Sequence, residues 1–285
     1  MEQAIHDAVE AFRRSVESAI VGELSFPVSL DASRRVLKAV ENPDIGAVSL
    51  AKVLVAEPLL SAKVIRLANS AALSPNGQHV SDVRQAVLRV GIDPIKVLAT
   101  VLIMDQLRHG QRNSVCRELS DRLWERTVYV AALSFVVAGK MTRLNPDEAM
   151  FAGIVHDLGR FYLLSKAADF PALIESRKVL AETINDLAAR VAPSVLAALD
   201  LPPAVVDAVA ASRVCQGAMP PETLGDLLFV ARKLSPRSDP FDEFDARQAS
   251  CEESAVALGL DQGTVAEVIA ASGDEIYSIV VALES

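Results

Sequence analysis

Apolar residues recur at helical spacing along almost the whole chain. Near the start, one apolar stripe with charged residues on the opposite face predicts an amphipathic helix over 1–21. Its members are Ile5, Ala8, Val9, Phe12, Val16, Ala19 and Ile20. We expect this stripe to pack on its own domain rather than on a partner, because most such stripes are core. No stretch alternates as a half-buried strand does. The pattern therefore predicts an all-α multi-helix bundle with an N-terminal helical lobe and a C-terminal helical tail.

Capping and turn residues divide this pattern into segments, since Pro favours the first position of a helix and Gly or Asn-Pro its end. The expected helices cover about 47–56, 58–70, 81–91, 93–108, 115–141, 146–156, 158–168, 171–180, 182–199, 203–213, 220–234 and 247–283. An acidic segment, 235–246, separates the last two helices. Its Asp239, Asp242, Glu243 and Asp245 lack the glycine and final glutamate of a calcium loop. We therefore expect a solvated loop there.

Composition and charge restrict the function. The 28 Lys+Arg and 37 Asp+Glu residues give a net charge of −9, so the chain has no general attraction for nucleic acid. Three widely spaced cysteines without a CxxC motif indicate a reducing compartment rather than disulfides or a zinc site. The longest strongly apolar stretch, 128–139, is about half of what a membrane-spanning helix needs. We expect a cytoplasmic protein with no membrane association.

The adjacent His156 and Asp157 are the clearest candidate for chemistry. A neutral imidazole beside a carboxylate is one edge of a metal site. A catalytic metal needs three or four converging ligands, and the chain contains only four histidines. From the dipeptide alone we favour a histidine that is hydrogen-bonded inside the bundle and an aspartate that caps a helix.

The segment 47–70 has the outline of a helix–turn–helix, with Lys63 and Arg66 on its second helix. A recognition helix reads bases with its N-terminal residues. Here these residues are Leu59, Leu60, Ser61 and Ala62. Because they are mostly apolar and the chain is acidic, we favour packed core helices over a DNA-binding motif.

Several blocks of the sequence, taken in order, carry a family resemblance. They are Phe26-Pro27, Asn42-Pro43-Asp44, Leu50 to Leu60, Arg66-Leu67-Ala68-Asn69-Ser70-Ala71, Val80 to Gly91, Leu123-Trp124, Phe151-Ala152-Gly153 with His156-Asp157-Leu158-Gly159-Arg160, and Leu201-Pro202 to Val209. They resemble the HDOD domain of bacterial signalling proteins, an HD-superfamily relative described as having lost the metal-binding pattern. The resemblance implies an HD-like bundle, with an N-terminal amphipathic helix (1–21), an HDOD-like helical domain (22–215) and a C-terminal helical subdomain (216–285).

The metal ligands of active HD hydrolases are replaced in this sequence. Where those enzymes begin the ligand set with a histidine, this chain has Arg126. Where related members carry further histidines, it has Ala188 and Ser212-Arg213. The GYP motif of the HD-GYP phosphodiesterases is absent after Arg160.

Arg126 adds a physical objection to a metal, because a permanent cation would pair with Asp157 and repel a divalent ion. The resemblance therefore implies that His156 and Asp157 are a remnant pair, with Arg126 facing them in a structural ion pair. We expect no metal, no catalytic residue and no cofactor.

The resemblance implies a non-catalytic bacterial signal-transduction or regulatory protein, such as the output of a response regulator. It would act by binding a protein partner or, alternatively, a small ligand or nucleotide. The first alternative is a metal-dependent phosphohydrolase or cyclic-dinucleotide phosphodiesterase, in which acids such as Asp207 or Glu175 join His156 and Asp157. The second is a DNA-binding regulator through residues 47–70, although we do not expect nucleic-acid binding.

Overall fold

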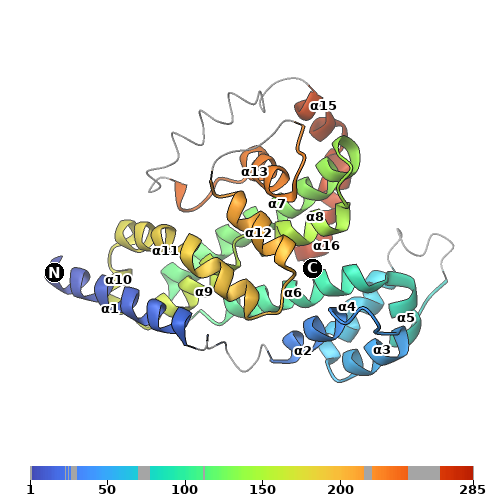
Figure 1. Ribbon diagram of the computed structural model, residues 1–285, viewed down its shortest axis with the longest axis horizontal. Coiled ribbons are helices and arrows are strands. Elements are labelled where there is room, and N and C mark those ends of the chain that lie inside the picture. Colours follow the sequence, from blue (N-terminus) through green and yellow to red (C-terminus); the bar gives the residue numbers. More distant parts are fainter. Residues whose placement is uncertain are drawn as a thin grey trace. The chain divides into compact units, whose positions relative to one another are not determined.

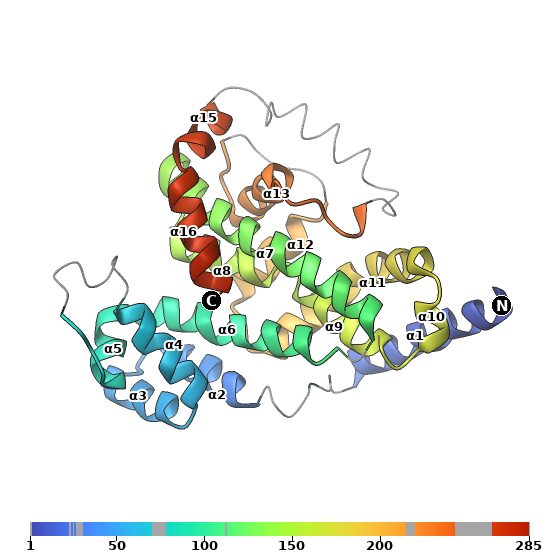
Figure 2. The same ribbon diagram turned by 180° about the vertical axis from the view of Figure 1, so that it is seen from behind.

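The computed structural model describes residues 2–22, 24, 26, 31–69, 78–111, 113–214, 220–242 and 264–284. In this part of the chain every regular element is a helix and none is a strand, which confirms the all-α prediction (Figures 1 and 2). The chain divides into two compact units, residues 26–106 and residues 1–25 with 107–285. The N-terminal helix thus groups with the later part of the chain rather than standing alone.

The unit of residues 26–106 consists of short helices joined by tight turns. They are α2 (Asp31–Val40), α3 (Ala47–Val55), α4 (Pro58–Ala68), α5 (Val83–Val90) and most of α6 (Ile92–His109). Both α3 and α4 pack on α5, and Leu50, Leu54 and Val64 are fully buried. After α4, the Asn69 side chain makes two hydrogen bonds of 2.7 Å, to the backbone N–H and C=O of Val80. This asparagine therefore fixes the chain path within the unit.

The second unit is built around the long helix α7 (Ser114–Met141). Its other helices are α1 (Glu2–Val21), α8 (Pro146–Val155), α9 (Leu158–Ala167), α10 (Pro171–Ile174), α11 (Arg177–Ala197), α12 (Pro203–Ala211), α13 (Leu224–Leu234), α15 (Thr264–Ala271) and α16 (Gly273–Glu284). Helices α8, α13 and α16 pack on α7, as Figure 2 shows for α16, and α9 packs on α11. The apolar stretch 128–139 is thus a core segment of α7. No described helix is long and apolar enough to cross a membrane.

The apolar stripe of α1 packs on its own unit, as predicted. Phe12 and Val16 are buried, and the Phe12 ring meets the edge of Phe170 with 5.3 Å between ring centroids. Beside them, Arg13 forms a 2.9 Å ion pair with Asp186 of α11. The helix is therefore held by both apolar and ionic contacts.

Several predicted helix boundaries are wrong. The break expected after residue 180 lies earlier, because Ser176 caps α11 with its hydroxyl. Helix α6 begins one residue before its predicted start, so that Asp93 lies inside its first turn. The helix expected over 247–283 is, in its described part, two helices separated at Ser272. The hydroxyl cap of Ser176 decided the first of these positions more than the apolar spacing did.

Close helix packing explains the two glycines that flank the His-Asp pair. A Cβ atom on Gly153 would lie 2.5 Å from the Cα of Ala131 in α7. One on Gly159 would lie 3.1 Å from the Cα of Ala192 in α11. The first contact leaves no room for any side chain without a backbone shift. These approaches hold α8 on α7 and α9 on α11, and so fix the turn between α8 and α9.

We predict that Gly153→Ala lowers the free energy of unfolding by about 2–3 kcal/mol, because α7 and α8 must move apart. Urea denaturation followed by circular dichroism measures this. Gly139→Ala is the matched control, since its Cβ would meet only the Pro146 side chain at an ordinary 3.5 Å. That variant should be neutral or more stable by up to about 1 kcal/mol. Equal stabilities for the two variants would contradict the close packing.

Candidate functional site: a buried charge cluster

The His-Asp pair lies in the short turn that joins α8 to α9. Helix α8 begins at Pro146, where Asn145 accepts hydrogen bonds from the next two free backbone N–H groups. The helix ends before His156, and α9 begins directly after Asp157. Both side chains of the pair are at most 1% exposed. The turn therefore directs them into the interior of the bundle.

His156 is held by its own helix. Its Nδ1 lies 2.7 Å from the C=O of Gly153, and because a carbonyl only accepts, Nδ1 carries the proton. Burial lowers the pKa of His156 and the charge of Arg232 adds to this, although Asp157 opposes it. The neutral ring then has a lone pair on Nε2. This atom lies 3.0 Å from Oδ2 of Asp157, without the alignment of a hydrogen bond.

Two arginines balance the charge of Asp157. Its Oδ1 accepts a 3.1 Å hydrogen bond from Arg213 and lies 3.6 Å from Nη1 of Arg160. Burial alone would raise the pKa of Asp157, but the positive charges of these two arginines hold it well below its usual value. The carboxylate is turned to the cations and makes no capping hydrogen bond to α9. The expected cap is therefore wrong, whereas the buried, hydrogen-bonded histidine is confirmed.

A second carboxylate, that of Asp239, enters from the segment after α13. Its Oδ2 accepts a 2.6 Å hydrogen bond from Arg160, and its Oδ1 accepts one of 3.0 Å from the backbone N–H of Phe241. Burial would raise the pKa of Asp239, but Arg160 and Arg126 lower it. The prediction of a solvated loop is wrong at this residue, because the cations draw its side chain into the interior. Residues 243–246 lie outside the described part of the chain.

Arg126 belongs to the same group of charges, but not through the predicted pair. Its Nε lies 3.5 Å from Oδ2 of Asp239, and its terminal nitrogens donate to the carbonyls of Arg232 and Arg237 at 3.0 and 2.9 Å. Asp157 is not among its ion-pair partners within 4.0 Å. Arg126 therefore forms its ion pair with Asp239, whereas Asp157 is paired with Arg160 and Arg213.

An asparagine and an aromatic ring complete the group. Arg160 donates a 2.9 Å hydrogen bond to Oδ1 of Asn185 and lies over the Phe241 ring, 5.0 Å from its centroid. Asn185 in turn donates to the carbonyl of Phe241 at 3.2 Å. We call this set the charge cluster. Its members are Arg126, His156, Asp157, Arg160, Asn185, Arg213, Arg232, Asp239 and Phe241.

The sequence did not point to Asn185, Arg232 or Asp239 as members of such a site. Asn185 and Arg232 lie in ordinary helical patterns, and Asp239 lies in a segment whose composition is typical of solvent-exposed loops. Besides His156 and Asp157, only Arg126, Arg160 and Arg213 could be noticed beforehand, because they stand within or beside the blocks of the family resemblance.

The described donor atoms at the turn do not fit a divalent metal. Nε2 of His156 and Oδ2 of Asp157 are buried and make no hydrogen bond, so two ligand positions exist. No group of three His, Cys, Asp or Glu suited to a metal occurs among the described residues. Asp207 and Glu175 are exposed, and the buried Ala188 brings no donor atom. A catalytic site needs at least three protein ligands, and nearby guanidinium groups repel a cation.

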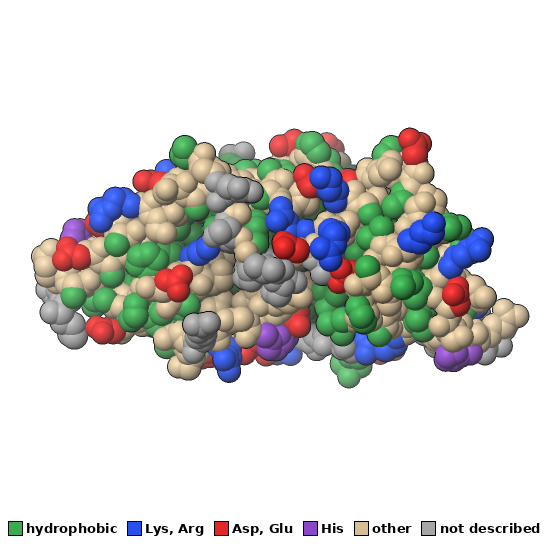
Figure 3. Space-filling model, turned by 90° about the horizontal axis from the view of Figure 1, so that it is seen from below, with side chains coloured by type: hydrophobic (Ala, Val, Ile, Leu, Met, Phe, Trp, Pro, Cys, Tyr) green, Lys and Arg blue, Asp and Glu red, His purple; other side chains and the backbone are tan. Residues whose placement is uncertain are grey.

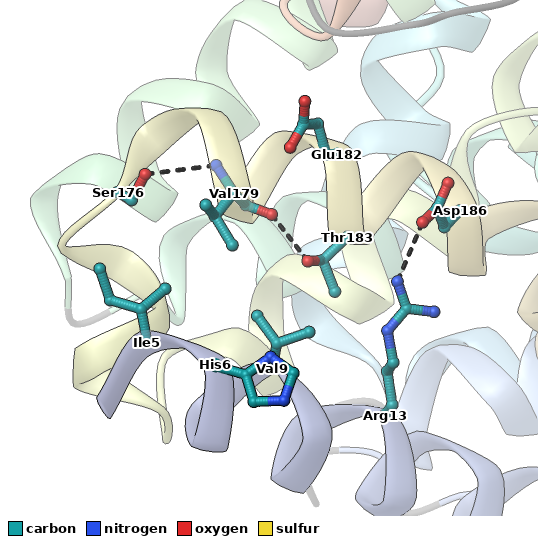
Figure 4. A pocket seen from close by; sticks show the side chains of 9 residues that line it. All are labelled: Ile5, His6, Val9, Arg13, Ser176, Val179, Glu182, Thr183 and Asp186. Atoms are coloured by element: carbon teal, nitrogen blue, oxygen red, sulfur yellow. Dashed lines mark hydrogen bonds and ion pairs between the residues drawn. The ribbon is translucent and has the colours of Figure 1, made fainter. Parts of the chain in front are cut away.

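A pocket of about 540 Å³ lies between α1 and α11 and shares no residue with the charge cluster (Figure 4). It is lined by Ile5, His6, Val9, Arg13, Ser176, Val179, Glu182, Thr183 and Asp186. Arg13 and Asp186 pair with each other across its side, as Figure 4 shows. The pocket is thus a surface feature formed where α1 packs on α11.

The helix pair over 47–70 presents little positive charge at its turn. At the start of α4, Leu59 is 59% exposed, whereas Leu60 and Ser61 are buried. Glu57, at the turn, pairs with Arg35 at 2.7 Å. On the face drawn in Figure 3, basic and acidic side chains of the described residues are interspersed, without an extended basic stripe. These features do not favour a DNA-binding surface.

Comparison with known families identifies the class of protein. The family model of the HDOD domain matches residues 26–214. The chain therefore belongs to the HDOD domain family, as the sequence blocks predicted. None of the curated proteins matches the chain.

Solved structures share the fold. A protein of Shewanella amazonensis SB2B, provisionally named a metal-dependent phosphohydrolase, is 22% identical with a TM-score of 0.71 over 99% of each chain. An HDOD domain protein of unknown function from Geobacter sulfurreducens is 18% identical with a TM-score of 0.60, over 97% of this chain and 98% of that one. A provisionally named signal transduction protein of Marinobacter aquaeolei VT8 is 19% identical with a TM-score of 0.60, over 97% of this chain and 66% of that one. At these identities the likeness establishes the fold alone.

We predict that Arg126→Met lowers the free energy of unfolding by about 3 kcal/mol, because it removes one cation from Asp239 and the donor from two backbone carbonyls. Chemical denaturation gives the value. Arg122→Met is the matched control, since Arg122 is an exposed residue on the preceding turn of α7 and should change stability by no more than about 0.5 kcal/mol. A loss below about 1 kcal/mol for Arg126→Met would contradict its role in the cluster.

Proposed function

We propose that this chain is a non-catalytic regulatory protein of bacterial signal transduction, in which a structural charge cluster has replaced the metal site. One observation carries the proposal. By the family resemblance, Arg126 stands where active HD enzymes have a histidine and Arg213 where related members have one, and each contacts a carboxylate of the cluster. The carboxylates thereby balance arginines, which removes both the ligands and the negative charge that would hold a divalent ion.

Such a domain acts by binding, and a protein partner is the binding target that we propose. The name of the similar Marinobacter protein places that protein in signal transduction, which supports the same context here. The smaller unit exposes Val55, Leu59 and Leu88, at 63%, 59% and 66%. Exposed apolar side chains suit a protein surface better than a phosphate backbone. We propose a cytoplasmic location, because the cysteine content is that of a reducing compartment.

Hydrolysis is the second candidate, and the likeness to the Shewanella protein favours it. It requires His156 and Asp157 to be joined by at least one further ligand on binding a metal. It also requires Arg213 to leave the carboxylate of Asp157, which it contacts at 3.1 Å. The two candidates therefore differ in whether the folded protein retains a divalent ion.

The test is the metal content of the purified, untagged protein after incubation with manganese, iron or zinc and removal of free ions. We predict less than about a tenth of an equivalent per chain, because the ligand requirement is unmet. Hydrolysis of phosphomonoesters and cyclic dinucleotides should equal that of the His156→Gln variant. One or two tightly held equivalents that are lost in His156→Gln, together with hydrolysis by the unaltered protein, would establish the second candidate instead.

A further inference from the structure

Helices α3, α4 and α5 of the smaller unit carry only basic charges. Their sequences contain Lys52, Lys63, Arg66, Arg84 and Arg89, and no Asp or Glu. The unit as a whole has 9 Lys+Arg and 7 Asp+Glu, although the complete chain has 28 and 37. Positive charge is thus concentrated on one part of an acidic protein, where it favours contact with an acidic partner.

Two of these charges are exposed, whereas others are engaged within the unit. Arg89 donates hydrogen bonds to the backbone carbonyls of Ala68 and Gln78. Lys63 is half-buried and is influenced by the charge of Asp105. Lys52 on α3 and Arg84 on α5 are both exposed to solvent.

The acids next to these helices have partners of their own. Glu57, between α3 and α4, pairs with Arg35 at 2.7 Å. Asp82 caps α5 and accepts a 2.9 Å hydrogen bond from the backbone N–H of Gln85, at the positive end of the helix. These two carboxylates are thus largely offset by their own neighbours rather than by Lys52.

Exposed apolar side chains lie among these charges. Val48, Lys52 and Val55 follow one another at i, i+4 and i+7, and therefore lie along one side of α3. Leu59 is exposed at the start of α4, four residues after Val55. Leu88 is exposed on α5, which packs on α3. The exposed side of α3 thus combines apolar and basic side chains.

The apolar exposure is concentrated in this unit. In the described part of the chain nine large hydrophobic side chains are exposed, and five of them lie in the smaller unit, which has less than a third of the residues. Single exposed apolar residues need no explanation, but a concentration of them marks an interaction surface. We define the docking face by its exposed members on the three helices: Val48, Lys52, Val55, Leu59, Arg84 and Leu88.

We propose that the docking face binds an acidic amphipathic helix of a partner protein. The inference rests on the proposed function, since it names the kind of partner that a domain acting by binding would take. An amphipathic helix presents apolar residues three or four positions apart, which is the spacing of the stripe on α3. Acidic side chains beside that apolar stripe would meet Lys52 and Arg84.

Other occupants match the docking face less well. The same face of a second copy would place basic side chains opposite basic side chains, which is unfavourable. A phosphate backbone would pair with Lys52 and Arg84, but it would leave the valines and leucines without an apolar contact. The combination of both kinds of side chain therefore favours the acidic amphipathic helix.

The test is a titration of the full chain into fluorescently labelled 20-residue peptides, followed by anisotropy. The probe is a model helix with leucines along one stripe and glutamates on the remaining surface. One comparison peptide has the same composition with the leucines distributed around the helix, and another has lysine in place of glutamate. The probe should bind at least about tenfold more tightly than either comparison peptide. Added salt should weaken this binding.

Two pairs of variants locate the binding surface. Val55→Ser should weaken binding of the probe about fivefold, because buried apolar area is lost. Val214→Ser is the matched control, since these valines are 63% and 64% exposed and Val214 lies in the other unit. Lys52→Gln should weaken binding about threefold and reduce its salt dependence. Lys178→Gln, at an exposed lysine of α11, should leave binding unchanged.

Every other outcome overturns the inference. Equal affinities for the three peptides, no binding of the probe up to about 1 mM, or equal effects of Val55→Ser and Val214→Ser would each do so. Tighter binding of duplex DNA or of anionic phospholipid vesicles, weakened by Val55→Ser, would assign the face to that occupant instead. Self-association in sedimentation that Val55→Ser abolishes would assign it to a second copy. The metal content, which tests the proposed function, is independent of all these results.

Discussion

A guanidinium group in a protein interior must be surrounded by acceptors, and this constraint organises the larger unit of the chain. Arg160 lies at its centre, 3% exposed, with Asp239, Asn185, the ring of Phe241 and, slightly farther away, Asp157 around it. These groups come from three different parts of the chain. Their positions depend on one buried cation, because moving any of them away would leave a charge or a dipole unbalanced.

The same contacts extend the domain beyond the family match. Asp239 and Phe241 follow residue 214, where the match ends, yet they supply the second carboxylate and the aromatic contact of Arg160. Arg126 binds the carbonyl of Arg237 and so holds the same segment from α7. Residues 239–241, which are buried, are therefore part of the folded core. Arg126, which by the family resemblance stands where active HD enzymes have a histidine, is thus coupled to an acidic residue far away in the sequence.

The fold could be predicted from the sequence because helical periodicity and capping residues are local signals. The stripe around Phe12 predicted a packed helix, and the blocks around Asn69 and His156 predicted the family. The charge cluster could be predicted only in part. Burial of His156 followed from its apolar surroundings, but the partner of Arg126 did not, because an ion pair over more than a hundred residues leaves no periodic signal. We expected Asp239 to face solvent because the residues around it in the sequence are polar. In the structure it is surrounded by arginines from distant parts of the chain, which no local pattern could indicate.

The most direct test of this account is a double-mutant cycle between Arg160 and Asp239, measured by chemical denaturation of Arg160→Gln, Asp239→Asn and the double variant. If the cluster holds residues 235–242 to α9, the two positions should be coupled by about 1–3 kcal/mol. The exposed pair of Arg177 and Glu118, 2.9 Å apart, provides the reference and should show at most about 0.5 kcal/mol. Additive effects of Arg160→Gln and Asp239→Asn, within about 0.5 kcal/mol, would contradict the central role of the cluster.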